Sequence, residues 1–295
     1  MIQSLVRKGK VADLVGRYGQ VIMDECHHVP AVSFERVLAE AKARFVVGLT
    51  ATPHRRDGLH PIIEMQLGPV RFSVDAKSEA ARRPFGQRLV VRETAFHLPA
   101  RSKTPTIQEL YAALAGDQKR NEMILDDVIN SLAEGRSPIL LTERKDHLQG
   151  FAERLRGFTR HLVVLHGGMS ARERRTVMES LAAIPPEDER LVLATGRYIG
   201  EGFDDARLDT LFLALPVSWK GTLVQYTGRL HRLHPGKSEV RIYDYVDREV
   251  PMLSRMFEKR LRGYRAIGYV PDDMRSGSVE ATTDIAPEED VDLDA

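Results

Sequence analysis

Two adjacent carboxylates, Asp24 and Glu25, directly follow the apolar run at residues 21–23. A short, continuously apolar run bounded by polar residues is typical of a strand buried on both faces of a parallel sheet. Such sheets bind ligands at the carboxyl ends of their strands. There, one carboxylate can hold Mg²⁺ through water while its neighbour orients and deprotonates an attacking water. The pair therefore indicates phosphoryl transfer, whereas an isolated Asp-Glu pair is in most proteins only a solvated turn.

Two arginines in the second half of the chain, Arg229 and Arg232, could serve the same reaction. They lie three positions apart, so on a helix they share one face and can reach the same triphosphate. Guanidinium groups also make planar bidentate contacts that lysine cannot make. If they come from a second domain, hydrolysis depends on domain closure. The alternative is that they belong to a basic surface patch with His231, His234 and Lys237.

Four segments, in order, resemble the motifs of superfamily 2 helicases. Residues 24–27 (Asp-Glu-Cys-His) resemble motif II, and residues 48–53 (Gly-Leu-Thr-Ala-Thr-Pro) resemble motif III. Residues 191–195 with residues 200–204 resemble motif V, and residues 225–232 (Gln-Tyr-Thr-Gly-Arg-Leu-His-Arg) resemble motif VI. Four ordered motifs at strand ends make the resemblance specific.

Within this superfamily the chain looks most like the DNA-repair and type III restriction group, judged by residues 24–28, 49–57 and 165–169. The likeness runs from about residue 3 to residue 269. It implies an α/β protein with two RecA-like parallel-sheet domains of the P-loop NTPase type. It also implies that ATP and Mg²⁺ are cofactors and that the partner is nucleic acid, with DNA favoured over RNA.

The resemblance gives individual residues their expected roles. Asp24, which would bind Mg²⁺ through water, and Glu25 would be catalytic, with Arg232 as the arginine finger and Arg229 as its companion. The other expected roles are nucleotide binding by Gly202, Asp204 and Gln225; coupling by His27, Thr50 and Thr52; and nucleic-acid binding by Ser4, Arg55, His166, Gly167 and Thr195. A hydroxyl at a strand end is, taken alone, more often a turn bond than a ligand contact. Tyr226 stands where related helicases commonly carry arginine.

The sequence contains no Gly-x-x-x-x-Gly-Lys-Ser/Thr loop, the element that wraps triphosphate oxygens. We therefore expect the chain to begin inside its first motor domain, with the phosphate loop supplied by an N-terminal part of the same protein or by a partner. The alternative function is a non-catalytic nucleic-acid-binding or regulatory fragment. A third function, a metal-dependent hydrolase using Asp24, Glu25, His27 and His28, would leave motifs V and VI unexplained.

Length and composition bound the remaining choices. The 295 residues, with 42% hydrophobic and 29% charged side chains, predict two globular domains. The single cysteine, Cys26, excludes an internal disulfide, and we expect it to pack as a small hydrophobe. No apolar stretch is long enough for a membrane span, which favours the cytoplasm. Residues 276–295 hold seven acids and no Lys or Arg, which leaves a net charge of +8 on the rest of the chain.

The alternation of strand and helix signals predicts four regions. These are residues 1–70, the C-terminal part of the first RecA-like domain; 71–115, a connector; 116–270, the second RecA-like domain; and 271–295, an acidic disordered tail. Gly135 suits the left-handed residue after a helix, and Ser170 with Glu173 forms a capping-box pattern. A last helix is expected over residues 252–267, with its apolar stripe inward and Arg260 among the basic residues outside.

Overall fold

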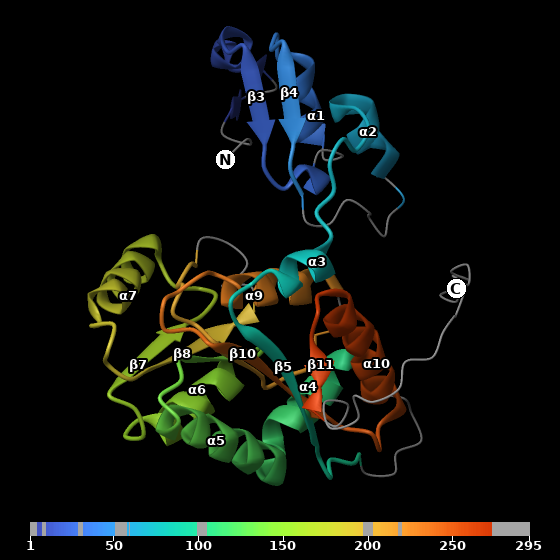
Figure 1. Cartoon of the computed structure of the whole chain (residues 1–295). Helices are drawn as coiled ribbons and strands as arrows, with labels where there is room; N and C mark the ends of the chain where they lie inside the picture. The colour runs from blue at the N-terminus through green and yellow to red at the C-terminus, as the bar shows by residue number, and fades with distance from the viewer. Residues whose placement is uncertain are drawn as a thin grey trace.

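The computed structural model describes residues 5–7, 10–28, 32–50, 58, 60–98, 105–196, 203–217 and 220–272. They form a smaller N-terminal unit and a larger unit, joined by the segment that leads into α3 (Ala76–Ala81) (Figure 1). In this part of the chain none of the helices has the length and apolar content that a membrane span requires.

The smaller unit is built on two parallel strands, β3 (Gln20–Met23) and β4 (Phe45–Gly48), as the sequence predicted. One face of this sheet is covered by α1 (Val32–Ala39), α2 (His60–Leu67) and the short 3-10 helix η3 (Cys26–His28). Strands β1 (Val6–Arg7) and β2 (Lys10–Val11) form a separate antiparallel pair, followed by the 3-10 helix η2 (Asp13–Arg17). The core of the covered face contains Cys26, which is only 3% exposed, as expected.

The opposite face of the β3–β4 sheet is apolar and open. Its side chains, Ile22, Phe45, Val47 and Leu49, are between 40% and 61% exposed. Alternate residues of a strand point to opposite faces. These four residues therefore alternate with the residues that pack against α1 and α2. Parallel sheets are normally buried on both faces. The smaller unit therefore presents an exposed apolar face of the kind that is usually buried in a parallel sheet.

The larger unit contains a seven-stranded, wholly parallel sheet in the order β11-β5-β10-β9-β6-β8-β7. Its strands are β5 (Gly86–Glu93), β6 (Pro138–Thr142), β7 (His161–Leu165), β8 (Arg190–Thr195), β9 (Thr210–Leu213), β10 (Glu239–Val246) and β11 (Val270–Pro271). Its helices are α3, α4 (Ile107–Gly116), α5 (Gln118–Ala133), α6 (Lys145–Leu155), α7 (Ala171–Ala183), α9 (Lys220–Leu230) and α10 (Pro251–Ala266). The α/β class with a large parallel sheet is thus confirmed.

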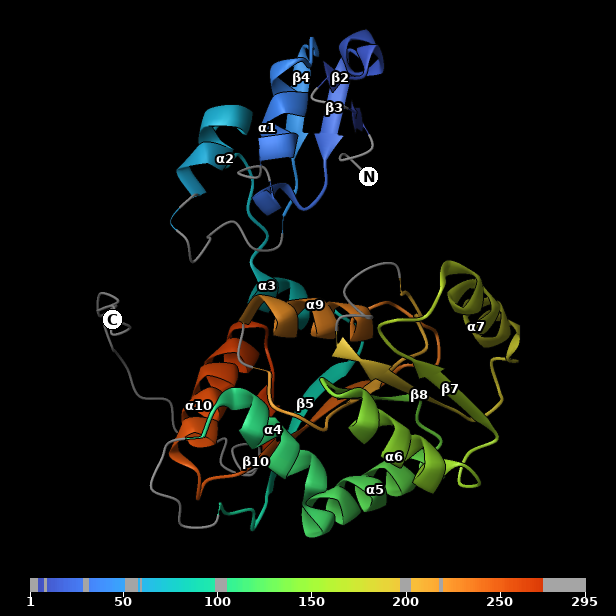
Figure 2. The same ribbon diagram turned by 180° about the vertical axis from the view of Figure 1, so that it is seen from behind.

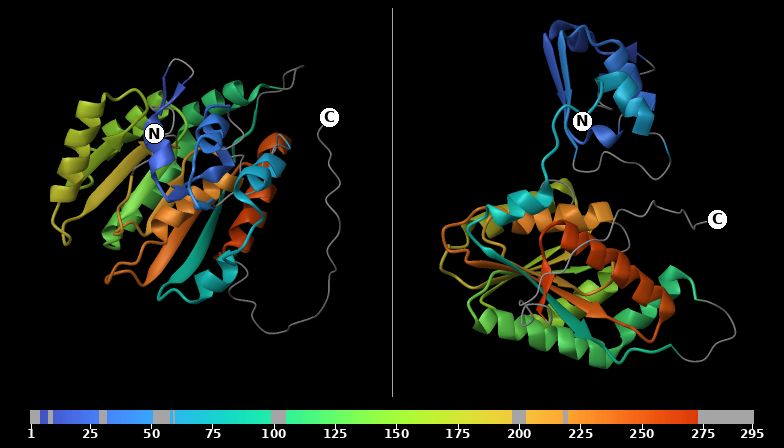
Figure 3. Two further views of the ribbon diagram at one scale, coloured as in Figure 1. Left: turned by 90° about the horizontal axis from the view of Figure 1, so that it is seen from above. Right: turned by 45° about the vertical axis from the view of Figure 1, so that its right-hand side comes forward.

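Both faces of the large sheet are buried, which is why its strands read as continuous apolar runs. Leu140 of β6 packs with α5 and α6, whereas its neighbours Ile139 and Leu141 belong to the core formed with α7, α9 and α10. All three are at most 3% exposed. Figures 2 and 3 show these two layers of helices on either side of the strands.

The local signals at the helix ends are confirmed. Gly135 follows α5 with φ of 72°, a left-handed conformation that glycine adopts without strain. The Ser170 hydroxyl accepts from the Glu173 amide, and the Glu173 carboxylate accepts from the Ser170 amide, so the capping box is present at α7. An equivalent box at α4, formed by Thr106 and Glu109, lies in the region that the sequence predicts to be connector.

The structure differs from the expected regions at two places. Strand β5, inside the 71–115 connector, pairs with β10 along all of its length, so this segment is part of the larger sheet. Likewise β11 includes Pro271, and Asp272 forms an ion pair with Arg88, so the chain is still attached to the sheet where the acidic tail was expected to start. Residues 273–295 of that tail lie outside the described residues.

The expectation that Arg260 lies on the outer face of α10 is wrong. Arg260 is 4% exposed and donates to both Asp244 carboxylate oxygens, at 2.7 and 2.8 Å. The hydroxyl of Tyr264 donates to the same carboxylate at 2.8 Å. Asp244 lies inside strand β10, and its buried carboxylate needs a cation nearby. That Arg260 supplies this cation depends on how α10 packs on the sheet, which the sequence does not show.

Candidate functional site

The carboxylates of the predicted motif II lie at the carboxyl end of β3. Asp24 is exposed and its Oδ1 accepts from the Glu25 amide at 2.9 Å. The next turn is tied to β4, because the Cys26 amide donates to the Leu49 carbonyl at 2.9 Å. The arrowheads of β3 and β4 point toward the side of the larger unit where α3 and α9 lie (Figures 1 and 2).

Three predicted residues meet at this strand end. His27 Nδ1 lies 3.0 Å from Thr50 Oγ1 and 3.1 Å from Glu25 Oε2. The contact with Thr50 is a hydrogen bond, whereas Glu25 Oε2 approaches the imidazole without forming one. His27 is 8% exposed, which keeps this junction largely shielded from water. The ends of β3 and β4 are thereby connected through one imidazole.

Glu25 has a left-handed backbone with φ of 51°, unlike the other non-glycine residues that the structure describes. That conformation costs an L-residue roughly 1–2 kcal/mol. Strain of this kind persists where surrounding contacts fix the chain, and it concentrates at functional sites. Here it directs the Glu25 carboxylate back toward His27.

Close packing behind the carboxylates depends on Gly48 and Cys26. A Cβ at Gly48 would lie 2.5 Å from Leu67 Cδ1 and 3.0 Å from Cys26 Sγ. A glycine at the end of β4 thus allows α2 and the turn after β3 to approach the strand. Burial raises the pKa of the Cys26 thiol, which suits a packing role.

The donor set at β3 suits Mg²⁺ held together with a nucleotide. Mg²⁺ usually binds one or two carboxylates, with waters and substrate phosphates completing its coordination. Asp24 and Glu25 offer that number of carboxylates. The described residues contain no group of three or more His, Cys, Asp or Glu that could hold a metal ion, so a protein-only metal cage does not fit this part of the chain.

In the larger unit, Asp204 and Arg232 are brought together. Arg232 Nε donates to Asp204 Oδ1 at 3.1 Å, and each side chain is 53% exposed. Arg229, in the last turn of α9, and Gln225 are partly buried on the same helix. The predicted nucleotide contact of motif V and the predicted finger of motif VI are therefore neighbours in space.

A buried charge cluster holds the chain next to Asp204. Asp205 is 8% exposed and lies 3.1 Å from a guanidinium nitrogen of Arg190, itself 1% exposed. Asp205 also accepts from the amide of Arg207 at 3.0 Å. Burial lowers the pKa of Arg190 to about 10. These contacts anchor the chain at residue 205, while Asp204 remains accessible.

On the other side, Lys237 fixes the backbone around Arg232. Its Nζ donates to the carbonyls of Leu230 and Arg232, each at 2.8 Å, and the residue is 7% exposed. Burial lowers the pKa of Lys237 to about 8, against the attraction of Asp209 and Asp205. The alternative of a simple surface patch therefore fails for Lys237, which is a buried helix-end contact.

Tyr226, the residue that replaces the usual arginine, is 4% exposed. A Cβ at Gly196 would collide with its hydroxyl and with Glu143 Oε1. Burial raises the pKa of Tyr226. Tyr226 thus packs beneath the end of β8 instead of reaching outward as a phosphate-binding arginine would.

The nucleic-acid candidates of the larger unit lie at the ends of β7 and β8. The Gly167 amide donates to Thr195 Oγ1 at 3.1 Å, and His166 Nδ1 lies 2.9 Å from the Gly167 carbonyl. His166 is partly buried and Gly167 is exposed. Ser4, Thr52, Arg55 and Gly202 lie outside the described residues.

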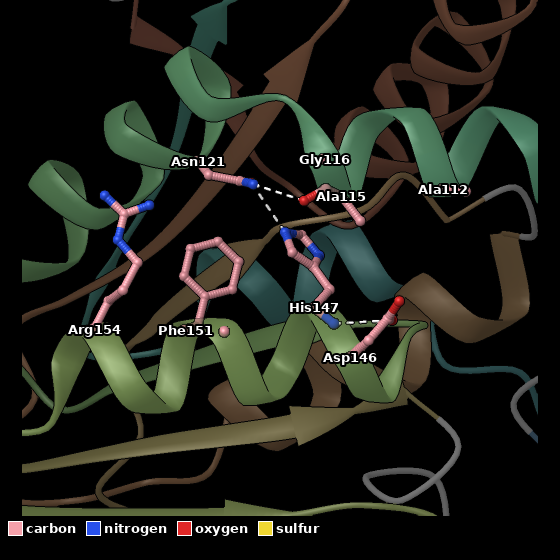
Figure 4. A pocket seen from close by; sticks show the side chains of 9 residues that line it. Ala112, Ala115, Gly116, Asn121, Asp146, His147, Phe151 and Arg154 are labelled. Carbon is pink, nitrogen blue, oxygen red and sulfur yellow. Dashed lines mark hydrogen bonds between the residues drawn. The ribbon is translucent and has the colours of Figure 1, made fainter.

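A hollow of about 290 Å³ lies where α4, α5 and α6 meet (Figure 4). His147, in its wall, is bonded on both sides, with Nδ1 3.0 Å from Thr142 Oγ1 and Nε2 2.9 Å from Asn121 Oδ1. Burial lowers the pKa of His147 to about 4. None of the predicted site residues lines the hollow, and its histidine is already satisfied, so we assign no chemistry to it.

Sequence reasoning missed the side chains that support the site. Nothing in the sequence pattern points to Arg190 or Arg83, and Lys237 and His231 enter the sequence analysis only in the alternative of a basic surface patch. A basic residue at a strand start or after a short helix carries no local signal of burial. Their partners come from distant parts of the chain.

Two family models match the chain. The model of the type III restriction enzyme res subunit matches residues 1–55, and the model of the helicase conserved C-terminal domain matches residues 120–234. A similar curated protein is the probable helicase D10 of Escherichia phage T5, 26% identical over 267 residues, covering 86% of this chain and 56% of the relative. The chain spans about half the length of the curated relatives it matches.

Two solved structures share the fold. The S. cerevisiae Dbp5 structure, bound to RNA and ADP BeF3, matches with a TM-score of 0.53 at 13% identity. The match covers 87% of this chain and 60% of the Dbp5 chain. The ATP-dependent type ISP restriction-modification enzyme LlaBIII, bound to DNA, matches with a TM-score of 0.56 at 17% identity. The match covers 84% of this chain and 20% of the LlaBIII chain. With the motif order, the matched models and the RecA-like architecture in agreement, this chain belongs to the superfamily 2 helicases.

Proposed function

We propose that this chain carries motifs II, III, V and VI of an ATP-dependent DNA helicase or translocase, in which ATP hydrolysis drives movement along nucleic acid. The observation that carries the proposal is the junction of Glu25, His27 and Thr50 at the ends of β3 and β4. It connects Glu25, whose backbone is left-handed, to Thr50 at the end of β4 through the buried His27 imidazole. A change at the nucleotide would reach the nucleic-acid side of the domain by this path.

In the proposed reaction, Asp24 holds Mg²⁺ through water and Glu25 orients and deprotonates the attacking water. Arg229 and Arg232 stabilise the charge that develops on the transferred phosphoryl group when the units close. Gly202, Asp204 and Gln225 bind the nucleotide, with Asp204 accepting from the ribose. Thr50, Thr52 and His27 couple the two sites.

Nucleic acid would be bound through its backbone by Ser4, Arg55, His166, Gly167 and Thr195. Hydroxyls, backbone amides and arginine contact phosphates without reading bases. The preference for DNA rests on likeness to the type III restriction group. Binding of this kind weakens as salt rises, because condensed counterions are released.

The phosphate loop would come from another polypeptide segment, either an N-terminal part of the same protein or a partner. The sequence has no such loop, and the open face of Ile22, Phe45, Val47 and Leu49 is the kind of surface that a further strand and helix would cover. We also propose that domain closure occurs between the smaller unit and the larger unit, across the segment around α3.

The deciding experiment is ATP hydrolysis by the chain supplied with the segment that carries the phosphate loop, with and without single-stranded DNA, beside Glu25→Gln and Arg232→Ala. Matched controls are Glu153→Gln on α6 and Arg255→Ala on α10, both exposed and outside the site. We expect DNA-stimulated turnover that both site variants abolish and both controls preserve. Turnover that survives Glu25→Gln would overturn the assignment.

A non-catalytic nucleic-acid-binding module is the second candidate, favoured by the absence of the phosphate loop from the sequence. It predicts salt-sensitive DNA binding without turnover, even at high ATP. Restoring turnover by adding the loop-bearing segment in trans would then return the chain to the motor class.

A further inference from the structure

His231, within motif VI, is held between two residues far from it in sequence. Its Nδ1 contacts Arg83 Nη1, and its Nε2 lies 2.9 Å from the Tyr269 hydroxyl. The Tyr269 ring stacks on the imidazole, with centroids 5.6 Å apart and planes 16° apart. Tyr269 is only 1% exposed, so these contacts lie in the interior of the larger unit and not on its surface.

The donors and acceptors fix the state of the imidazole. A guanidinium offers only donors, so His231 Nδ1 must accept from Arg83. A neutral imidazole then carries its hydrogen on Nε2 and donates it to the Tyr269 hydroxyl. Burial, reinforced by Arg83 and Lys237, lowers the pKa of His231 to about 3, which keeps this tautomer at neutral pH.

The backbone on both sides of His231 is fixed as well. Lys237 Nζ binds the carbonyl of Leu230, immediately before it, and that of Arg232, immediately after it. His231 and Arg232 therefore move with the groups that hold them. Arg232 is the residue that reaches Asp204.

Arg83 belongs to the segment that connects the two units. It follows α3, which lies beside α9 on the side of the larger unit nearest the smaller one (Figures 1 and 3). The packing there is close, because a Cβ at Gly268 would lie 2.8 Å from Ala80 Cβ. Phe85, 6% exposed, has its ring 6.2 Å from that of His231.

We propose that Arg83 and His231 are positioning residues. They determine how the Arg232 side chain is oriented, and this orientation depends on the position of the connecting segment. When the units change their separation, a displacement of α3 acts through the Arg83–His231 contact on the adjacent Arg232. The arginine finger is then aligned by the same segment that joins the units. This inference rests on the proposed role of Arg232 in ATP hydrolysis.

The test compares Arg83→Ala with Arg82→Ala, because Arg82 is the adjacent residue, is 77% exposed and pairs only locally with Glu79 among the contacts described. In DNA-stimulated hydrolysis we expect Arg83→Ala to lower kcat by about tenfold or more with little change in KM for ATP, since misplacing a transition-state group affects kcat. Arg83→Lys should restore part of the loss, and Arg82→Ala should behave as wild type.

A double variant separates positioning from a general structural effect. If Arg83 acts through Arg232, then Arg83→Ala adds no further loss in kcat to Arg232→Ala. Additive losses, or equal losses in Arg83→Ala and Arg82→Ala, would overturn the proposal while leaving the ATPase assignment standing.

A readout that needs no turnover keeps the two proposals apart. The rate at which phenylglyoxal labels Arg232, measured by peptide mass spectrometry, should change at least about twofold in Arg83→Ala and stay unchanged in Arg82→Ala. Unchanged labelling in Arg83→Ala refutes the positioning contact. Changed labelling in a chain without turnover supports the contact and refutes the catalytic role of Arg232 in this chain alone.

Discussion

Arg232 Nε donates a hydrogen bond of 3.1 Å to Asp204 Oδ1, and both side chains are about half exposed. The next residue, Asp205, instead points into the interior and pairs with the fully buried Arg190. Two consecutive aspartates thus serve opposite purposes. One is available to a ligand, and the other holds the loop in place.

The neighbouring aspartates should respond differently to the same substitution. Asp204→Asn weakens a half-exposed ion pair, so the free energy of unfolding should fall by at most about 1 kcal/mol. Asp205→Asn leaves Arg190 buried without its anion and should cost about 3–5 kcal/mol. Urea unfolding of both variants measures the difference, and equal losses would contradict it. ATP binding should weaken in Asp204→Asn, although that variant stays folded.

Glu25 should be replaceable by glycine without loss of stability. Its left-handed backbone costs roughly 1–2 kcal/mol, which offsets the roughly 0.5–1 kcal/mol that glycine loses through its greater freedom when unfolded. Glu153→Gly, in the last turn of α6, has no such relief and should cost up to about 1 kcal/mol. We therefore expect Glu25→Gly to be at least as stable as wild type in thermal unfolding, while its ATP hydrolysis is abolished. A Glu25→Gly protein less stable than Glu153→Gly would disprove the strain argument.

Two glycine-to-alanine changes should have opposite signs. Gly150 lies within α6 with nothing near its missing Cβ, so Gly150→Ala should raise the free energy of unfolding by about 0.5–1 kcal/mol. Gly268 has φ of 92°, and its Cβ would meet Ala80, so Gly268→Ala should lower it by about 2 kcal/mol. The midpoints of urea unfolding curves decide the signs. Stabilisation by Gly268→Ala would mean that α3 is not packed as closely as described.

Stability should decline as the pH falls below neutral. The folded chain keeps His231 and His147 neutral down to pH values of about 3 and about 4, whereas the unfolded chain protonates them near 6.5. Between those limits the unfolded state binds more protons, so stability rises with pH, by at most about 1.4 kcal/mol per pH unit for each histidine. Above about pH 6.5 these two groups no longer contribute to the slope.

Urea unfolding at pH 7, 6 and 5 measures this slope. His147→Gln and His231→Gln should each flatten it, and the exposed His97→Gln serves as the comparison that changes a histidine without disturbing a buried contact. A slope that is the same in all three variants as in wild type would show that neither buried histidine is responsible.

Much of the fold could be predicted because its signals are local. The strands ending near Met23, Thr142, Leu165 and Thr195 are short apolar runs in the sequence, and the last three lie within the larger sheet. The helix ends marked by a glycine or by a capping box could also be predicted from the sequence. The apolar run before them was enough to predict that Asp24 and Glu25 lie at the end of a strand. Arg232, which we expected to share a helix face with Arg229, lies instead beyond the end of α9.

The assignment of β5 to the larger sheet could not be read from the sequence. Its partner, β10, lies about 150 residues further along the chain. Register across that separation is decided by long-range pairing and by the packing of Leu89 into the core, and neither leaves a local pattern. The prolines and arginines around β5 therefore suggested an irregular connector.

The sequence by itself determined the family, the position of the carboxylates at a strand end and the alternation of strands and helices, because these depend on residue type and short spacing. Tertiary structure alone decided which charges are buried and with whom. Arg260 pairs with Asp244, Arg190 with Asp205, and Arg83 with His231 across 148 positions. A buried charge must find its partner in space, and the identity of that partner depends on how distant elements pack.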